Sequence, residues 1–298
     1  MTEPEFDFLR AFLKARSGLA LTPDKQYLAE SRLEPVRRHF GLESLAALVA
    51  ALRAGRDPDL EISVLEAMTI NETFFFRDKI PFDLFKEVLL PRYMKARAAS
   101  KRLRIWCAAA STGQEPYSLA MLLDEARPSL AGWRIEILAT DLSKAVIDRA
   151  KAGLYTQFEV QRGLPIQLLL KHFTQVGDQW QISPKIREMV SFRTANLIRD
   201  FTPFGFFDII YCRNVLIYFD TATKSAVLQR LAAALAPDGA LVLGAAETVL
   251  GLTEALVPEP DHRGLYARAD APGLPPVRVA GARHPAFCAT PDLLRAST

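Results

Sequence analysis

The sequence predicts an α/β domain with a mostly parallel sheet, preceded by an all-α domain. Two observations carry this prediction. Apolar residues recur at helical spacing from the N-terminus to residue 68, and no strand-like alternation interrupts them. From residue 103 onward, short apolar runs alternate with helix-like segments. That pattern is typical of parallel strands whose two faces are covered by helices.

The N-terminal domain, residues 1–70, is predicted to consist of helices. Phe6, Leu9 and Leu13 lie at helical spacing in the first segment. A second helical segment is expected over Pro23–Phe40, and the glycine that follows, Gly41, is typical of the residue that ends a helix. Residues 45–52 and 62–68 continue the helical pattern.

Residues 71–102 link the two domains. They begin with the aromatic run NETFFFRDKIPFDLF, continue as a helix through Tyr93, and end in the basic stretch KARAASKR. Phe74, Phe75 and Phe76 cannot all lie on one stripe of a helix, so at least one is expected to pack outside the local core. From these residues alone we favour a hydrophobic hinge between the helical domain and the sheet domain.

The α/β domain is predicted over residues 103–269. Its elements are expected in the order strand Leu103–Ala108, helix Glu115–Glu125, strand Trp133–Thr140, helix Lys144–Ala152 capped by Ser143, strand Phe207–Cys212, helix Thr221–Leu235 and strand Ala240–Ala245. Between about residues 164 and 195 the alternation breaks. Strand-like pieces at 180–182 and 190–192 predict a small antiparallel β-subdomain there. Residues 270–298, rich in Pro, Gly, Ala and Arg, predict a disordered tail.

The composition excludes several classes of protein. The net charge of +3 is too small to indicate nucleic-acid binding and is compatible with an acidic protein partner. The 3 cysteines form no CxxC pair and the 4 histidines are scattered, so neither a disulfide framework nor a metal site is expected. The first ten residues lack the apolar core of a signal peptide, and no apolar stretch is long enough to span a membrane. We therefore expect a cytoplasmic protein without metal.

A turn of small residues follows the first predicted strand. It runs from Ala108 to Glu115 with the sequence AAASTGQE and leads into a helix. Small residues allow a ligand to approach the backbone of such a turn, next to the helix N-terminus. An acidic residue at the start of the helix disfavours a phosphate and suits a cationic or amino-bearing ligand. S-adenosylmethionine, with a sulfonium and an α-ammonium group, is one such ligand. An ordinary tight turn is an equally good alternative.

Polar residues also end two other predicted strands. Asp141 stands where nucleoside-binding α/β folds place an acid that accepts hydrogen bonds from ribose hydroxyls. The alternative for Asp141 is a helix N-cap. Arg213 follows the strand Phe207–Cys212 directly, at the sheet edge where α/β folds bind ligands. A salt bridge that closes the sheet edge is the alternative there.

Several segments together resemble one family. NETFFFRD, RIWCAAASTGQEPYSLAM, ATDLS, FRTANL and FDIIYCRNVLIYFD occur in the order and approximate spacing of the CheR-type chemotaxis receptor methyltransferases, over about residues 5–268. The resemblance implies a Rossmann-like S-adenosylmethionine methyltransferase domain with an antiparallel β-subdomain, behind an all-α domain. It also implies methylation of glutamate side-chain carboxylates on chemoreceptors, which yields γ-glutamyl methyl esters and S-adenosylhomocysteine.

The resemblance assigns roles to individual residues. The cofactor site is implied to be lined by Asn71, Thr73, Arg77, Glu115, Asp141, Asn196, Leu197, Arg213 and Asn214. Arg77 and Tyr218 match the positions nearest the transferring methyl group. Arg32 and Arg38 match basic positions on a helix that faces the methylation helices of the receptor. Without the resemblance, a solvated helix face is the better interpretation of these last two arginines.

The chain departs from the common family pattern at two positions. Cys107 stands where the family often has serine, and Gln114 where it often has glutamate. The predicted β-subdomain loop, QVGDQWQ, is short, so capture of a receptor-tail pentapeptide is not expected. The resemblance further implies a cytoplasmic monomer that is recruited to membrane receptor arrays without inserting into the membrane.

Two other functions compete with receptor methylation. One is a non-catalytic signalling scaffold that binds S-adenosylmethionine, and the other is a methyltransferase that acts on a different protein, a small molecule or RNA. The presence of Arg77, Asn214 and Tyr218 favours catalysis over the scaffold. A small-molecule or RNA enzyme would have no specific use for the basic N-terminal helix.

Overall fold

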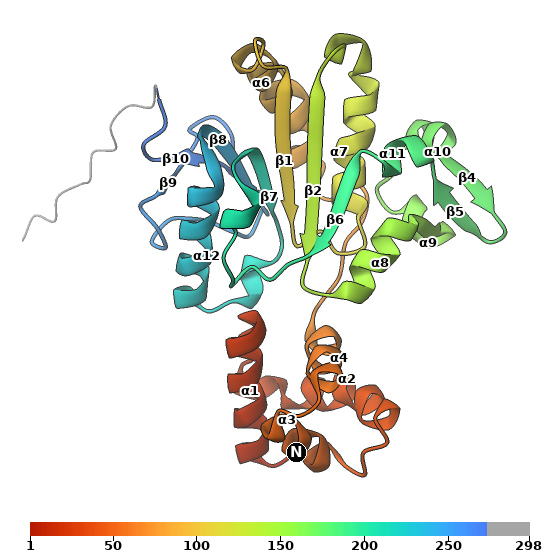
Figure 1. The fold of residues 1–298 in the computed structure, drawn as a ribbon, viewed down its shortest axis with the longest axis vertical. Coiled ribbons are helices and arrows are strands. Elements are labelled where there is room, and N and C mark those ends of the chain that lie inside the picture. Colours follow the sequence, from red (N-terminus) through yellow and green to blue (C-terminus); the bar gives the residue numbers. More distant parts are fainter. Residues whose placement is uncertain (273–298) are drawn as a thin grey trace, which may run out of the picture.

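The structure, a computed structural model, describes residues 1–272. It consists of a helical N-terminal domain and a larger sheet domain, which lie at opposite ends of the view in Figure 1. The predicted disordered tail, residues 270–298, lies outside the described residues except for its first three positions. No helix within the described part of the chain is long and apolar enough to cross a membrane.

The N-terminal domain is helical, as predicted. Its elements are α1 (Glu3–Ser17), η1 (Pro23–Lys25), α2 (Gln26–His39), α3 (Leu45–Ala54) and α4 (Pro58–Met68). Leu9, Leu33 and Leu48 are among the fully buried side chains of its separate core. The second predicted segment divides in two, because Lys25 leaves helical geometry between the 3₁₀ turn and α2. Gly41, in the left-handed conformation at φ 63°, donates its N–H to the carbonyl of Arg38 just past the helix end.

The segment before the sheet is helical up to Ala96. It consists of α5 (Ile80–Leu84), the π-helical turn η2 (Phe85–Leu89) and α6 (Leu90–Ala96). The three consecutive phenylalanines that precede it have different surroundings. Phe75 is fully buried, and its ring centre lies 5.0 Å from that of Tyr155 and 5.6 Å from that of Phe173. Phe75 is therefore packed within the sheet domain and its β-subdomain, and the predicted hinge between the helical and sheet domains is wrong for this residue.

The main sheet has seven strands in the order β6-β2-β1-β7-β8-β10-β9. The strands are β1 (Arg102–Ala108), β2 (Arg134–Asp141), β6 (Val190–Thr194), β7 (Phe207–Cys212), β8 (Leu235–Leu243), β9 (Leu256–Pro258) and β10 (Leu265–Arg268). The first five are mutually parallel, while β10 runs antiparallel to both β8 and β9. The predicted mostly parallel sheet is confirmed.

Helices cover both faces of this sheet (Figure 1). The longer ones are α7 (Gln114–Glu125), α8 (Lys144–Ala152) and α12 (Thr221–Ala234), with short turns η3 (Arg127–Leu130), η4 (Thr202–Phe204) and η5 (Leu216–Tyr218) between elements. Strand β1 shows why two layers are needed. Ile105 and Cys107 enter the core that contains α7, whereas Trp106 and Ala108 enter the core that contains α12.

A small antiparallel sheet is also present, but its boundaries differ from the prediction. It comprises β3 (Leu154–Thr156), β4 (Phe173–Val176) and β5 (Gln179–Ile182), in the order β3-β5-β4, with the helices α9 (Gln157–Gln161), α10 (Ile166–His172) and α11 (Pro184–Arg187) around it. The second strand predicted for it, residues 190–192, instead pairs in parallel with β2 as β6 of the main sheet. Alternation of apolar side chains is the same in either setting, so it does not specify which strand becomes the neighbour.

Candidate functional site

A hollow of about 970 Å³, counting space open to solvent, lies at the carboxyl ends of the parallel strands. Its walls come from the loops after β1, β2, β6 and β7, from the segment Thr69–Thr73 with Arg77, and from Ser17 and Leu19 of the N-terminal domain. This edge of a parallel sheet is where α/β folds bind ligands. The N-terminal domain lies beyond the arrowheads of β1 and β2 in Figure 1, so the hollow is formed between the two domains.

All the residues that the resemblance assigns to the cofactor line this hollow, namely Asn71, Thr73, Arg77, Glu115, Asp141, Asn196, Leu197, Arg213 and Asn214. Tyr218 lines it as well. These residues are far apart in the sequence and come from the linking segment and the sheet domain. Arg32 and Arg38 do not line it. The geometry therefore groups the predicted cofactor residues, while what they bind stays a prediction.

The turn after β1 has an unusual backbone. Ala109 and Ser111 adopt positive φ values of 63° and 49°, and Gly113 has φ 93°. A Cβ atom at Gly113 would lie 3.0 Å from the Cβ of Ala150, so glycine also allows helix α8 to pack closely. Positive φ at non-glycine residues costs energy and is concentrated at functional sites. The Ser111 hydroxyl donates a 2.8 Å hydrogen bond to the carbonyl of Asn71, which joins the turn to the opposite wall.

Asp141 is not the N-cap of the following helix. Ser143 has that position, and its hydroxyl accepts a hydrogen bond from the N–H of Val146, as predicted for Ser143. The Asp141 carboxylate accepts the N–H of Ser111 at 2.8 Å and the N–H of Ser143 at 3.1 Å. Burial raises the pKa of Asp141, although these backbone donors oppose the increase. A buried carboxylate at a β-strand end, with further lone pairs, suits the hydroxyl groups of a ribose.

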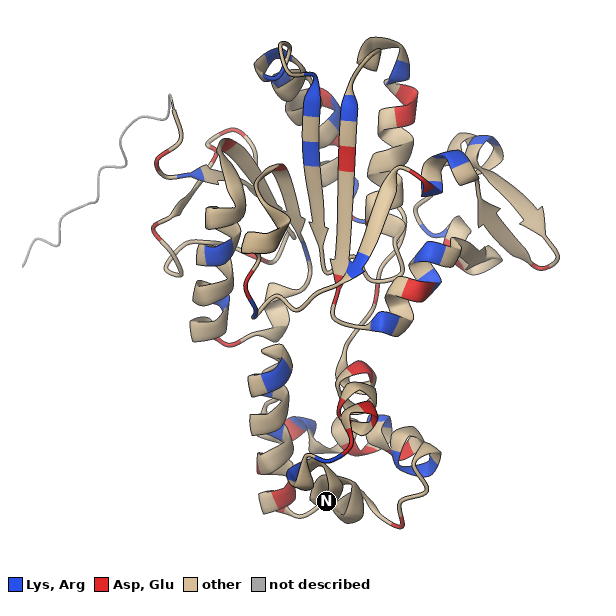
Figure 2. Cartoon of the chain, in the orientation of Figure 1, with Lys and Arg blue, Asp and Glu red and all other residues tan. Residues whose placement is uncertain are grey.

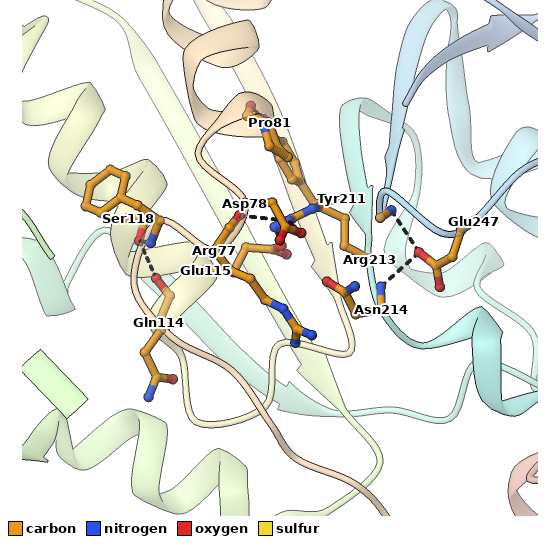
Figure 3. A network of polar contacts seen from close by, with 12 residues as sticks. Arg77, Asp78, Pro81, Gln114, Glu115, Ser118, Tyr211, Arg213, Asn214 and Glu247 are labelled. Atoms are coloured by element: carbon orange, nitrogen blue, oxygen red, sulfur yellow. Dashed lines mark hydrogen bonds and ion pairs between the residues drawn. The ribbon is translucent and has the colours of Figure 1, made fainter. Parts of the chain in front are cut away.

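Arg213 makes the salt bridge that was its alternative interpretation, and it also lines the hollow. One end of its guanidinium lies 2.8 Å from Glu115, and the other end lies 2.8 Å from Asp78 and from the carbonyl of Arg77 (Figure 3). The Arg213 side chain is only 1% exposed. Burial raises the pKa of Glu115, and Arg213 opposes that increase. The pair holds a carboxylate at the first turn of α7 without the desolvation cost of an unpaired charge.

Arg77 and Tyr218 line the same hollow. The Arg77 guanidinium donates a 2.7 Å hydrogen bond to the carbonyl of Glu72 and lies 5.7 Å from the ring centre of Phe74. The Tyr218 hydroxyl has no hydrogen-bond partner within residues 1–272, and partial burial raises its pKa. Its backbone carbonyl accepts the N–H of Ala20, so the N-terminal domain is joined to this residue.

The chain matches two family models that together span most of its length. Residues 4–69 match the CheR methyltransferase, all-alpha domain, and residues 71–262 match the CheR methyltransferase, SAM binding domain. The chain belongs to the CheR methyltransferase family. Its methyltransferase domain is therefore of a type that binds S-adenosylmethionine. The predicted Rossmann-like domain behind an all-α domain is confirmed.

The matches between this CheR-family chain and its relatives cover most of both chains. It is 42% identical to Chemotaxis protein methyltransferase 1 of Vibrio cholerae, over 83% of this chain and 90% of the relative. It is 41% identical to Chemotaxis protein methyltransferase 1 of Pseudomonas aeruginosa, over 87% of this chain and 92% of the relative. A solved glycopeptide N-methyltransferase, MtfA, is 16% identical over 60% of this chain and 65% of that chain, with a TM-score of 0.32, which adds nothing to the family assignment.

The two arginines that the CheR resemblance assigns to the receptor differ in their surroundings. Arg32 donates to the carbonyl of Met68 at 3.1 Å and to that of Thr69 at 3.4 Å, so it caps the end of α4. Arg38 has a side chain that is 72% exposed and pairs with Glu34 at 2.9 Å. The solvated-face interpretation therefore describes Arg38 and does not describe Arg32.

Asn196 and Glu247 show what the sequence reasoning missed in this CheR-family site. The Asn196 amide donates a 2.6 Å hydrogen bond to the carbonyl of Arg16, so it ties the N-terminal domain to the hollow as well as lining it. Glu247, in the run GAAETVL after β8, was not predicted at all. Its carboxylate is buried and accepts backbone N–H groups of the loop after β7. A lone acid just past a predicted strand was the available signal.

Proposed function

We propose that this chain transfers the methyl group of S-adenosylmethionine to glutamate side-chain carboxylates of chemoreceptors. The products are γ-glutamyl methyl esters and S-adenosylhomocysteine. The observation that carries the proposal is one hollow at the carboxyl edge of the sheet that gathers Glu115 and Asp141 with Arg77 and Tyr218. Membership of the CheR family and about 40% identity to chemotaxis protein methyltransferases support the same activity.

The residues of the hollow fit S-adenosylmethionine. The cofactor, when bound, supplies a methyl group on a positively charged sulfonium. The buried carboxylate of Asp141 is matched to ribose hydroxyl groups, and that of Glu115 to the amino group of the methionyl part. Leu197 and Val215 provide apolar wall beside them. No metal is needed for this assignment.

The transfer requires no general base from the protein. A receptor glutamate has a pKa of about 4.3 and is already ionised at neutral pH. The role of the chain is to bind, orient and exclude water. Arg77 directs its guanidinium to the incoming carboxylate, and the Tyr218 hydroxyl donates a hydrogen bond close to the reacting atoms. Charge is neutralised between an anion and a cation in this reaction, so removal of water from the hollow favours it.

The receptor is proposed to approach from the N-terminal domain. Ser17, Leu19, Thr69 and Ile70 of that domain border the hollow, so a receptor helix that contacts α2 would lie next to the site. The helices of the N-terminal domain carry both basic and acidic residues (Figure 2). Arg38 presents its guanidinium to solvent on α2, while Arg32 connects α2 to the end of α4. We further propose that the protein acts as a cytoplasmic monomer recruited to receptor arrays, without binding nucleic acid.

Methyl transfer is tested with tritiated-methyl S-adenosylmethionine, the purified protein and membranes that contain receptors of the same organism. We expect label on a receptor-sized band and its release as methanol by mild base, since carboxyl methyl esters are base-labile. Label that resists base would indicate a different acceptor group. Tight cofactor binding by calorimetry without any label would replace the enzyme by the non-catalytic scaffold.

A further inference from the structure

Glu247 is a buried acid whose partners are all backbone N–H groups. The residue is 8% exposed. One carboxylate oxygen accepts the N–H of Asn214 at 2.8 Å (Figure 3) and that of Gly244 at 2.8 Å. The other oxygen accepts the N–H of Val215 at 3.0 Å and that of Leu216 at 2.8 Å. These four donors satisfy a buried carboxylate that makes no salt bridge within residues 1–272.

The amides that Glu247 holds belong to one functional loop. Asn214, Val215 and Leu216 begin two residues after the end of β7, and Leu216 is the first residue of the turn η5, which ends at Tyr218. Asn214 has φ 58°, a left-handed conformation that few non-glycine residues adopt. Three consecutive amides bonded to one carboxylate leave this backbone little freedom. The strained conformation is therefore maintained by its surroundings rather than by the loop itself.

Gly244 shows how tightly the two loops are joined. A Cβ atom at this position would lie 2.7 Å from a carboxylate oxygen of Glu247 and 3.0 Å from the backbone nitrogen of Asn214. A side chain would therefore displace either the carboxylate or the loop after β7. The loops that follow the neighbouring strands β7 and β8 meet at this point, on the sheet edge where the hollow lies.

We infer that Glu247 is a positioning residue for methyl transfer, because it fixes the backbone of Asn214–Leu216 and thereby the side chains of Asn214 and Tyr218 in the hollow. Glu247 does not line the hollow, whereas Asn214 and Tyr218 do. Its action thus passes through the loop. The inference rests on the proposed function in one respect, namely the role of Tyr218 in methyl transfer.

The test compares Glu247→Gln with Glu259→Gln. A glutamine side chain has one acceptor oxygen and one donor group, so the amide nitrogen would face backbone donors and leave part of the cluster unbonded. Glu259 is the control, because it is a half-buried acid of the same domain that lies outside the hollow and pairs with Arg92 at 2.6 Å rather than with backbone N–H groups. We expect Glu247→Gln to lower the methylation rate per bound cofactor by about tenfold or more, and Glu259→Gln to leave it unchanged.

Two readouts separate positioning from a loss of stability. Hydrogen–deuterium exchange of the amides at Asn214, Val215 and Leu216 is expected to accelerate in Glu247→Gln and not in the control, and this readout needs no receptor. In a double-mutant cycle, Tyr218→Phe is expected to cost less in the Glu247→Gln background than in the natural sequence, because both changes act on the same loop. If the natural protein did not methylate receptors, the proposed function would be refuted. The exchange rates of the three amides would still show whether Glu247 fixes the loop.

Gly244→Ala serves as the second variant if Glu247→Gln does not fold. Its added Cβ meets the same carboxylate, so it is expected to give the same pattern in exchange and in rate. The inference is overturned if Glu247→Gln, or Gly244→Ala in its place, keeps a rate per bound cofactor within about twofold of Glu259→Gln. The inference is also overturned if the effect of Tyr218→Phe on the rate is fully additive with the effect of Glu247→Gln, or of Gly244→Ala in its place.

Discussion

The Ser143 hydroxyl donates a 2.8 Å hydrogen bond to Glu66, a residue of the other domain. The same oxygen of Glu66 accepts the N–H of Ala145 at 3.1 Å. An acid from α4 of the N-terminal domain therefore lies at the N-terminus of α8, where an exposed N–H and the helix dipole favour negative charge. Asp141, which lines the hollow, is two residues before Ser143. The contact between the two domains is thus adjacent to the hollow.

Removal of this contact is expected to weaken cofactor binding. Glu66→Ala removes the acceptor of both hydrogen bonds, and we expect the dissociation constant for S-adenosylmethionine to rise about three- to tenfold, the range for loss of a helix-capping group. The measurement is titration calorimetry. Glu61→Ala is the control on the same helix, since Glu61 pairs with Arg16 inside the N-terminal domain. Equal affinities in the two variants would show that the contact does not support the site.

Tyr218→Phe is expected to lower turnover while cofactor affinity is retained. The substitution removes only a hydroxyl that has no partner among the described residues, so folding loses little. If that hydroxyl donates to the reacting atoms, its loss costs about ten- to a hundredfold in kcat. Single-turnover methylation and calorimetry measure the two quantities separately. A loss of affinity with kcat intact would assign Tyr218 to cofactor binding instead.

Cofactor affinity is expected to fall as the pH is lowered. The fall is expected to begin at a higher pH than it would if Asp141 had the pKa of an exposed aspartate. Burial raises the pKa of Asp141, so the cofactor-free folded protein binds this proton more readily than the unfolded chain. Its stability therefore decreases as the pH rises through that window. Cofactor binding has the opposite sign, because ribose hydroxyl groups need the ionised carboxylate as acceptor.

Variants of Asp141 check this pH dependence. We expect Asp141→Ala to weaken cofactor binding mainly, with a smaller effect on turnover. Asp141→Asn is expected to weaken binding and also to flatten the pH profile of the dissociation constant, which calorimetry at several pH values measures. A profile of unchanged shape in Asp141→Asn would show that another group, such as Glu115, controls the dependence.

Gly163→Ala is expected to destabilise the protein far more than Gly177→Ala. Both glycines have positive φ, so alanine costs about 1 kcal/mol at either position. A Cβ at Gly163 would lie 2.1 Å from the carbonyl oxygen of Phe75, whereas nothing lies within 4 Å of one at Gly177. The additional cost at Gly163 is expected to be at least about 2 kcal/mol in the free energy of urea unfolding. Equal values would show that the Phe75 segment moves aside without cost.

Arg38→Ala is expected to raise the KM for receptor and to leave cofactor affinity unchanged. Its guanidinium is exposed on α2 and outside the hollow. The expected factor is about three- to tenfold at low salt and smaller at high salt, because exposed charges are screened. Arg53→Ala, on α3, is a control for the removal of an N-terminal-domain charge. A rise in KM of the same size in that control would indicate a non-specific effect of net charge.

Much of the fold follows from local sequence patterns. The spacing of Leu9 and Leu13, the strand Phe207–Cys212 and the cap at Ser143 were each predictable and are confirmed. In each case the signal lies within a few neighbouring residues, as a period of side chains or a capping side chain next to a helix. The order of the motifs was enough to identify the family, and therefore the residues that line the hollow.

The tertiary structure decided the contacts between segments that are distant in the sequence. Alternation at Val190–Phe192 predicted a strand but not its pairing with β2, and three phenylalanines in a row did not reveal that Phe75 lies against the β-subdomain. The partners of Arg213 and the four amides around Glu247 were equally hidden. Alternating apolar residues indicate that a strand needs a neighbouring strand, and a lone acid past a strand indicates that a carboxylate needs hydrogen-bond donors. Only the folded chain, in which separate loops meet at one sheet edge, determines which residues supply them.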